Sequence, residues 1–546
     1  MDPARGGKSE ITPIEPVNMA LLILISILPV AFAFIYPIVY YIVDAKSLRR
    51  FPSPSPIAAL TPLWVIYHNW KGRKYLAVDE AHYKYGPVTR IAPDHLSFAD
   101  PKAYKDIYGH GSSIIKDIFY DNLAGDTPSM ADTTSRELHS SKRRNVSSVF
   151  SAKNITLMEP KVMDTVRKLL GALRRQTEGG RVGSKDQYPV IKREFDLRPW
   201  LNMFTFDAFS SMLWSSNYGF LDRGNDDCFS MSEDGTVTTV QAMDSFRTGV
   251  HFNTICAQLS PSGYKFIRWV TQKTYKTQAA DLFTGMARYQ SVKRLEHTPA
   301  EPDFFSFFKI ASSEEQASGK KTASMKLPDL VAECTSFLNA GNDTTQISLT
   351  NAIYELATHP AEQQKLYDIL REYLPESSRP IASYAELIKI PYLRAVLDET
   401  FRVQPPVRFG LPRRTTESGA TISGHFIPAG VTVSSSLHTL HRNESLFHKA
   451  NEWIPDRWIQ GHPDVTSTEW QNLKVYVLPF TLGGRACIGR NLAYMELSIC
   501  LAALVMAFDW KVSPEQAMGY THYERLNSSP VELMVSPRPR PESWNT

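Results

Sequence analysis

The chain has 546 residues, 43% of them hydrophobic, and a formal net charge of +4 at pH 7. This charge is too small to indicate nucleic-acid binding, and the absence of internal repeats or long linkers predicts one large domain over residues 63–546. The five cysteines are far apart, odd in number and form no Cys-x-x-Cys pair, which argues against a disulfide framework or a zinc site.

The first predicted element is a long apolar segment near the N-terminus. Residues 16–43 contain no charged side chain, and roughly 20 apolar residues are enough to cross a bilayer. The segment is longer than the apolar part of a cleaved signal peptide and lacks a small-residue cleavage site. We therefore expect a transmembrane anchor over 17–43 after a short luminal stretch over 1–16. Lys and Arg are more frequent after the segment than before it, which predicts that the following domain is cytoplasmic.

A basic and proline-rich stretch follows the anchor. Prolines alternate with serines over residues 52–56, and this density favours an extended, polyproline-like chain over a helix. We expect residues 44–62 to form a stiff hinge. Beyond it, two short strand-like runs at 88–91 and 95–98 flank Ala-Pro-Asp and predict a β-hairpin.

A long helix is predicted from Pro328 onward. Proline is favoured in a first helical turn, and the apolar residues that follow recur at a spacing of three to four. Residues 340–345, with the sequence Ala-Gly-Asn-Asp-Thr-Thr, therefore lie in mid-helix, although glycine costs about 1 kcal/mol there and the polar side chains compete for backbone hydrogen bonds. Such a local inconsistency is often functional. Without other motifs, a turn between two helices is the commoner explanation.

A second helix is predicted over residues 391–402, ending before Pro405-Pro406. It carries Glu399 and Arg402 three residues apart, and on a helix surface such a pair contributes only roughly a few tenths of a kcal/mol. Residues 422–433 indicate strand, turn and strand. Helices dominate and the strands are short, so the predicted fold class is α+β, mainly α-helical.

The most informative stretch is residues 480–489, with the sequence Phe-Thr-Leu-Gly-Gly-Arg-Ala-Cys-Ile-Gly. A free cysteine is usually a buried core residue, but here five positions match a pattern with a chemical purpose. A cysteine thiolate is an axial ligand of haem iron. Glycines let backbone N–H groups approach the sulfur, an arginine can pair with a haem propionate, and a glycine after the cysteine lets a helix begin close to the porphyrin.

This decad resembles the haem-binding loop of the cytochrome P-450 superfamily, Phe-x-x-Gly-x-Arg-x-Cys-x-Gly, at every defining position. Three more stretches resemble the same family in the same order. Residues 340–345 resemble its oxygen-activation motif, Glu399-Thr-Phe-Arg402 its Glu-x-x-Arg, and residues 453–458 its Pro-Glu-Arg-Phe segment. Residues 137–154 resemble filamentous-fungal members, including benzoate para-hydroxylase-like enzymes.

The resemblance implies a cytochrome P-450 fold with small β-sheets, preceded by a single transmembrane helix. It also implies haem b (iron protoporphyrin IX), with Cys487 as the axial iron ligand. His139 departs from the tryptophan of many relatives but still offers an N–H donor. Asp343 and Thr344 take the catalytic, proton-delivering role. The other implied cofactor-binding residues are Phe480, Gly483, Arg485, Gly489, His139, Arg143 and Arg413, and the implied structural triad is Glu399, Arg402 and Arg457.

The implied activity is that of a membrane-anchored, fungal-type microsomal haem-thiolate monooxygenase. It would insert one oxygen atom from O2 into a lipophilic small molecule, by hydroxylation, epoxidation or oxidative desaturation, in fungal secondary-metabolite biosynthesis. We expect a single-pass protein of the endoplasmic reticulum membrane with a cytoplasmic catalytic domain and no nucleic-acid partner. NADPH-derived electrons would come from NADPH-cytochrome P-450 reductase, with cytochrome b5 as a second candidate donor. Lys142, Arg144 and Arg490 are candidate contacts for an acidic reductase surface.

Three alternatives stay open. The first is a thiolate-haem isomerase or dehydratase that does not use O2, against which the Asp343-Thr344 pair argues. The second is an aromatic-acid, benzoate-type hydroxylase in catabolism. The third is a membrane-anchored haem sensor or carrier without NADPH-driven turnover.

Overall fold

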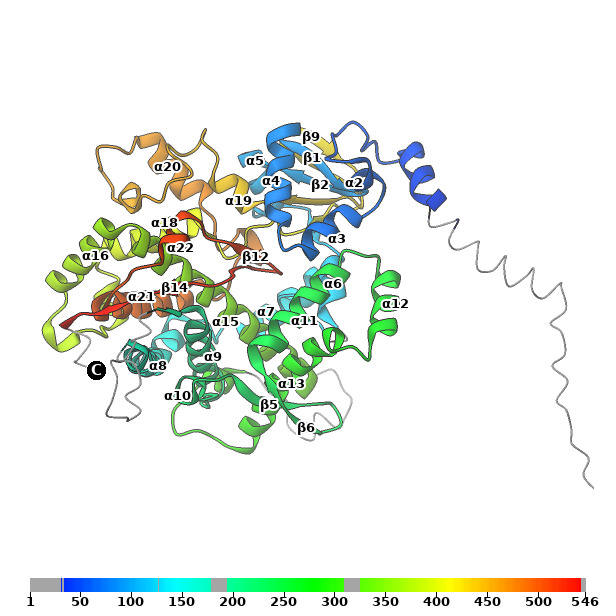
Figure 1. Cartoon of the computed structure of the whole chain (residues 1–546). Coiled ribbons are helices and arrows are strands. Elements are labelled where there is room, and N and C mark those ends of the chain that lie inside the picture. Colours follow the sequence, from blue (N-terminus) through cyan, green and yellow to red (C-terminus); the bar gives the residue numbers. More distant parts are fainter. Residues whose placement is uncertain (1–30, 32–33, 126, 178–193, 309–324, 542–546) are drawn as a thin grey trace, which may run out of the picture.

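The computed structural model describes residues 31, 34–125, 127–177, 194–308 and 325–541, and it is mainly helical with small β-sheets (Figure 1). The long helices are α8 (Ala152–Thr177), α9 (Arg198–Trp214), α11 (Ala242–Cys256), α13 (Tyr275–Glu296), α15 (Leu327–Thr358), α16 (Pro360–Tyr373), α18 (Pro391–Val403) and α21 (Arg490–Ala507). Shorter helices are α2 (Pro56–Leu60), α3 (Leu63–Trp70), α4 (Lys74–Tyr85), α5 (Pro101–Tyr108), α6 (Phe119–Ala124), α7 (Arg136–Val146), α12 (Pro261–Thr271) and α20 (Ser467–Tyr476).

The largest sheet has five strands in the order β1-β2-β10-β7-β3. Strand β2 pairs with β10 in parallel, and the other neighbours are antiparallel. In Figure 1 this sheet lies at the upper right with α4 and α5, and the helix-rich part of the molecule lies below it. Its strands are β1 (Val88–Ala92), β2 (His95–Phe98), β3 (Ile115–Lys116), β7 (Arg413–Arg414) and β10 (Thr432–Ser435).

Three hairpins and two pairs of distant strands complete the strand structure. The distant pairs are β4 (Phe195–Asp196) with β14 (Met534–Val535) and β11 (Phe508–Asp509) with β15 (Arg538–Pro539). The hairpins are β5 (Asp227–Met231) with β6 (Val237–Gln241), β8 (Ala420–Ile422) with β9 (His425–Ile427), and β12 (His522–Glu524) with β13 (Ser528–Pro530). The hairpin expected at 88–98 is confirmed as β1 and β2. In the region expected to be strand, turn and strand, β8 and β9 form the hairpin and β10 leaves it to join the larger sheet.

Helix α15 runs through the centre of the molecule and continues without interruption through residues 340–345. The alternative of a turn between two helices is therefore wrong. Pro328 lies in the first turn and Asp329 adds a favourable negative charge there. A Cβ at Gly341 would collide with the ring of Phe209 on α9, so this glycine allows two core helices to approach closely.

The core is formed by one large apolar cluster in which α21 is nearly enclosed. Among the described residues, α21 is the one helix long and apolar enough to cross a membrane, but 83% of it is buried inside the protein. It is therefore a core helix. A shorter apolar helix, Phe34–Val43, has largely exposed side chains. Most of the anchor expected over 17–43, and all of 1–16, lie outside the described residues.

The segment expected to be an extended hinge differs from that prediction. Residues 56–60 form helix α2, because Ser55 caps it by accepting a hydrogen bond from the Ala58 N–H and Pro56 occupies its first turn. The chain before it lies against the domain: the Tyr40 hydroxyl donates to Asp94 (2.8 Å), and the Lys46 amine lies 3.1 Å from the same carboxylate.

Candidate active site

A cavity of about 310 Å³ opens between α15, the start of α21 and the loop before it. This volume is in the range typical of ligand and cofactor sites. Aromatic and aliphatic side chains form most of its wall, including Phe150, Phe209, Phe337, Val407 and Leu492. The cavity therefore suits a flat, largely apolar group.

The loop that carries Cys487 lies between a short 3₁₀ turn, η4 (Gly483–Arg485), and α21. The backbone N–H of Cys487 donates to the Phe480 carbonyl (3.0 Å), and this hydrogen bond closes the loop. Gly483 has φ +73°, and a Cβ there would lie 2.5 Å from the Tyr108 carbonyl oxygen, so a side chain would both strain the backbone and collide. The thiol of Cys487 is accessible because it opens on the cavity.

The surroundings of the Cys487 sulfur combine two opposing effects. Enclosure by protein is the larger effect and raises the pKa of the thiol, and the backbone N–H of Gly489 and the charges of Arg143 and Arg490 reduce this rise. The thiolate is the form that binds a metal. Hydrogen bonds and positive charges around the sulfur therefore suit a cysteine that serves as a ligand.

One edge of the cavity is rich in basic side chains, of which the two arginines carry a full positive charge. His139, Arg143 and Arg485 line it together with Lys116, which the sequence analysis did not identify. Arg143 donates to the Ala486 carbonyl (3.0 Å) and so ties α7 to the cysteine loop.

Burial and neighbouring cations act on the two weaker bases of this edge. Burial, with the charges of Arg485 and Arg143, lowers the pKa of His139 to about 4. Burial, with the charge of Arg413, lowers the pKa of Lys116 to about 7. Such an excess of positive charge at an internal cavity is stabilised by anionic groups. A sulfur at the wall and cations at the edge fit an iron porphyrin with two propionates.

Arg413 differs from the other expected cofactor-binding residues. It is buried behind the cavity wall and is not among the lining residues, and its guanidinium donates to Tyr120 (3.5 Å) and Pro412 (3.0 Å). Its strand β7 pairs with β3, where Lys116 is its direct partner. Gly483 also lies outside the lining set, whereas Phe480 and Gly489 belong to it.

Glu496 is a second residue that the sequence analysis missed. It is the one acid among the described residues that line the cavity, and its Oε1 atom has no hydrogen-bond partner there. Burial raises the pKa of its carboxyl to about 8. Nothing in the local sequence distinguishes it from an ordinary helical glutamate.

Glu496→Gln is expected to make stability less dependent on pH. Because burial raises the pKa of Glu496, the native state binds its proton more tightly than the unfolded state, and the free energy of unfolding falls as pH rises from about 4.5 to about 8. The variant has no proton to lose, so its denaturant midpoint should change less across this range. Glu372→Gln, an exposed change, serves as the control. Equal pH dependence in wild type and Glu496→Gln would contradict the prediction.

Asp343 and Thr344, the expected catalytic residues, have different surroundings on α15. Thr344 lines the cavity, and its hydroxyl donates to the Ala340 carbonyl one turn earlier (2.6 Å). Asp343 is buried outside the lining set, and its Oδ2 atom accepts a hydrogen bond from the Asn527 amide (2.8 Å). Burial raises the pKa of Asp343, and Asn527 and nearby arginines oppose this effect.

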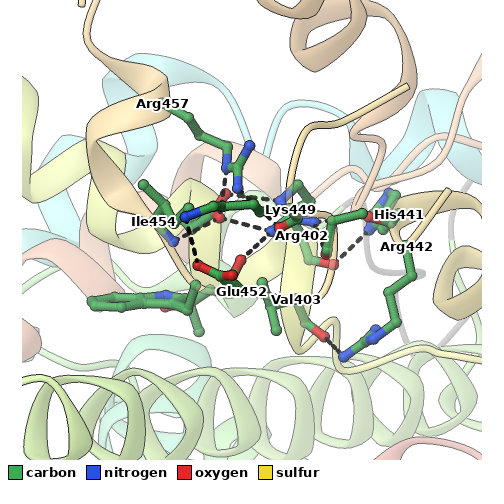
Figure 2. A network of polar contacts seen from close by, with 12 residues as sticks. Arg402, Val403, His441, Arg442, Lys449, Glu452, Ile454 and Arg457 are labelled. Atoms are coloured by element: carbon green, nitrogen blue, oxygen red, sulfur yellow. Dashed lines mark hydrogen bonds and ion pairs between the residues drawn. The ribbon is translucent and has the colours of Figure 1, made fainter. Parts of the chain in front are cut away.

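A buried ion cluster lies beside the site, where Arg402 and Arg457 converge (Figure 2). Both guanidiniums donate to Glu399 at 2.8 Å. The Trp458 indole and the Ile454 N–H each donate to the same carboxylate at 2.9 Å. Burial alone would raise the pKa of Glu399, but the arginines and hydrogen bonds outweigh it and hold this pKa below its ordinary value.

The candidate reductase contacts are partly occupied within the protein. Lys142 forms ion pairs with Asp329 (3.0 Å) and Glu333 (3.2 Å), and its side chain is only 12% exposed. Arg144 and Arg490 are exposed.

Comparison with known proteins follows this geometry. The family model described as Cytochrome P-450 matches residues 52–531. Cytochrome P-450 monooxygenase atr2 of Stereocaulon alpinum is 29% identical over 490 residues, which cover 87% of this chain and 88% of the relative. Benzoate 4-monooxygenase bphA of Aspergillus niger is 29% identical over 511 residues, covering 92% and 93%. Cytochrome P-450 monooxygenase poxM of Penicillium oxalicum is 28% identical over 486 residues, covering 89% and 88%.

Proposed function

Because this chain belongs to the cytochrome P-450 family, we propose that it binds haem b through the Cys487 sulfur and inserts one oxygen atom from O2 into a lipophilic small molecule. It is a haem-dependent monooxygenase, as its fungal relatives are. The observation that carries the proposal is the cavity in which the Cys487 sulfur and a cationic edge meet. The relatives' names argue against an isomerase, a dehydratase, a sensor or a carrier.

The chain's own residues hold and enclose the cofactor, and the bound haem supplies the activation of O2. Cys487 supplies the ligating sulfur, and Phe480 and Gly489 shape its surroundings. Arg143, Arg485 and His139 hold the propionates, with Lys116 as an added cation. Arg413 lies behind this edge, where its guanidinium donates a hydrogen bond to the Tyr120 hydroxyl.

Protons reach the cavity through the acid and the alcohol of α15. Thr344 lines the cavity. Its hydroxyl donates one proton at a time, and Asp343, its neighbour in sequence, resupplies that proton. In the resting arrangement the hydroxyl donates to the Ala340 carbonyl, so it must rotate towards the cavity to act.

Thr344→Val is expected to lower the fraction of NADPH electrons that appear in product about tenfold or more, while NADPH consumption continues. Valine keeps the branched shape but removes the hydroxyl, and a positioned proton donor contributes about 10²–10⁴-fold. Thr344→Ser keeps the hydroxyl and should retain most of the coupling. Product yield per NADPH measures the effect, and equal coupling in Thr344→Val and wild type would rule out this role.

The substrate class follows from the cavity wall and the relatives. Aromatic and aliphatic side chains favour a lipophilic substrate with few polar groups. The relatives support either tailoring of a secondary metabolite or hydroxylation of an aromatic ring, the latter through the similarity to a benzoate 4-monooxygenase. Incubation of the membrane-bound enzyme with reductase, NADPH, isotopically labelled O2 and a panel of lipophilic aromatics tests this. Label in the product supports the proposal. Product that contains only unlabelled oxygen, taken from water, would reject it.

The proposed organisation is a luminal stretch over 1–16, an anchor over 17–43, a stiff hinge over 44–62 that contacts the domain, and the haem domain over 63–546. The protein lies in the endoplasmic reticulum membrane with the domain in the cytoplasm. Exposed aromatic side chains on α3 (Trp70) and α12 (Phe266, Trp269) support membrane association. Both helices lie towards the same side of the molecule as the N-terminal helix in Figure 1.

Electrons come from NADPH-cytochrome P-450 reductase, with cytochrome b5 as a second donor.

A further inference from the structure

The turn between β12 and β13 is held rigidly against the core. The Arg525 N–H donates to the Asn527 carbonyl (2.9 Å), which closes the turn. The Ser528 N–H donates to the Pro406 carbonyl (2.8 Å), which attaches the turn to the chain that follows α18. All three residues of β13 are buried, and β13 packs against α15. The backbone around Asn527 therefore determines where its side chain lies.

The Asn527 side chain meets Asp343 in the interior. Its Nδ2 atom donates to Asp343 Oδ2 at 2.8 Å, and both residues are at most 9% exposed. An amide can donate through Nδ2 to an ionised carboxylate or accept through Oδ1 from a protonated one. Asparagine can thus remain bonded to Asp343 in either protonation state without adding a charge, which an apolar residue cannot do.

Three arginines surround this pair without binding the acid. Arg247 of α11, Arg525 of the turn and Arg198 of α9 all act on Asp343 through their charge. Yet, among the described residues, none of them brings a nitrogen within 4.0 Å of its carboxylate. A carboxylate free to move would gain a charge-assisted pair with one of these guanidiniums. Among the described residues, the contact that the Asp343 carboxyl makes instead is the hydrogen bond from Asn527.

We propose that Asn527 is the positioning residue for Asp343, and that it keeps this acid able to take up and release a proton by holding it away from Arg247 and Arg525. The inference rests on the proposed roles of Asp343 and Thr344. It makes the proton supply depend on the β12–β13 turn, a segment far from residues 340–345 in sequence. Arginine pairing would instead fix the carboxyl in its ionised form.

Asn527→Ala tests the proposal. Loss of the amide donor alone would raise the pKa of Asp343, but pairing with an arginine lowers it by more, because the guanidinium adds a full positive charge at contact distance and the amide adds only a hydrogen bond. The pH at which the carboxyl is half protonated should fall by about one pH unit, a tenfold change. Infrared spectroscopy of the haem-loaded protein measures this on the carboxyl band that disappears in Asp343→Asn.

Two further variants make the test specific. Asn527→Ala combined with Arg247→Gln removes an arginine that would capture the acid, so the half-protonation pH should move back upward. Ser529→Ala, a buried change on the same hairpin, should leave it unchanged. An unchanged or raised half-protonation pH in Asn527→Ala, with the haem spectrum intact, would overturn the proposal.

The same proteins separate this inference from the proposed function. Coupling of NADPH to product should fall several-fold in Asn527→Ala and recover in the double variant. If Asp343→Asn leaves coupling unchanged, the proton role of Asp343 fails, while the infrared shift still tests the positioning by Asn527.

Discussion

Replacement of Cys487 by alanine is expected to abolish both the strongly red-shifted Soret band of the reduced carbon monoxide complex and all product formation. The band depends on a thiolate bound opposite carbon monoxide, and Cys487 is the one cysteine among the described residues that lines the cavity. Thiolate ligation also favours cleavage of the O–O bond, so haem held without it should not sustain turnover. Difference spectra of membranes containing each protein measure the effect.

Cys500→Ala is the matched control. Cys500 lies buried on α21, the helix that begins beside the cysteine loop, and it does not line the cavity. This variant should keep the band and the activity. A folded, haem-loaded wild type without the band would show that another residue binds the iron, and the monooxygenase mechanism proposed for this site would fail.

Glu399→Gln is expected to destabilise the protein by about 3–5 kcal/mol, because it leaves the buried Arg402 guanidinium without a carboxylate and removes one of the two carboxylates that Arg457 contacts. The side chains of Glu399 and Arg402 are 0% exposed and that of Arg457 is 3% exposed. Hydrogen bonds to backbone carbonyls remain for both arginines, and Arg457 keeps its ion pair with Glu469. Arg402 has no other carboxylate among the described residues, and neutral acceptors do not replace that charge. Denaturant unfolding of the haem-loaded protein, monitored by fluorescence and haem absorbance, measures the loss.

Glu296→Gln provides the comparison, since Glu296 also pairs with a cation three residues away, Lys293, but both side chains are more than half exposed. It should change stability by less than about 1 kcal/mol. The pKa of Glu399 lies below its ordinary value, so its contribution is complete above about pH 4.5 and is lost only in stronger acid. Equal effects of the two substitutions would show that the buried cluster is not a source of stability.

Much of the site could be predicted because its signals are local. The cysteine loop is a continuous decad whose glycines and arginine act within a few residues of the sulfur. Helix α15 can be predicted from Pro328 in its first turn and from the apolar residues that recur at a spacing of three to four. The helix α2 was harder to predict, because a serine followed by proline is a common helix start, whereas the density of prolines over 52–56 favours an extended chain.

The remaining features depend on contacts between distant segments. Lys116 reaches the cavity because β3 pairs with β7, across nearly three hundred residues. The bond between Asn527 and Asp343 depends on how the C-terminal hairpin packs on α15. Neither register nor packing leaves a pattern in one sequence, because a lysine or an asparagine at such a position is indistinguishable from one on the surface.

The contact of Tyr40 and Lys46 with Asp94 has a mechanical consequence. Without slack chain between the helix Phe34–Val43 and the domain, rotation of one carries the other with it. With that helix in the bilayer, as proposed, the protein diffuses laterally with a constant tilt and always presents the same faces to lipid and to cytosol. Encounter with a reductase in the same membrane then becomes a search in two dimensions between partners of fixed orientation. Asp94 is the residue through which the helix fixes the orientation of the domain.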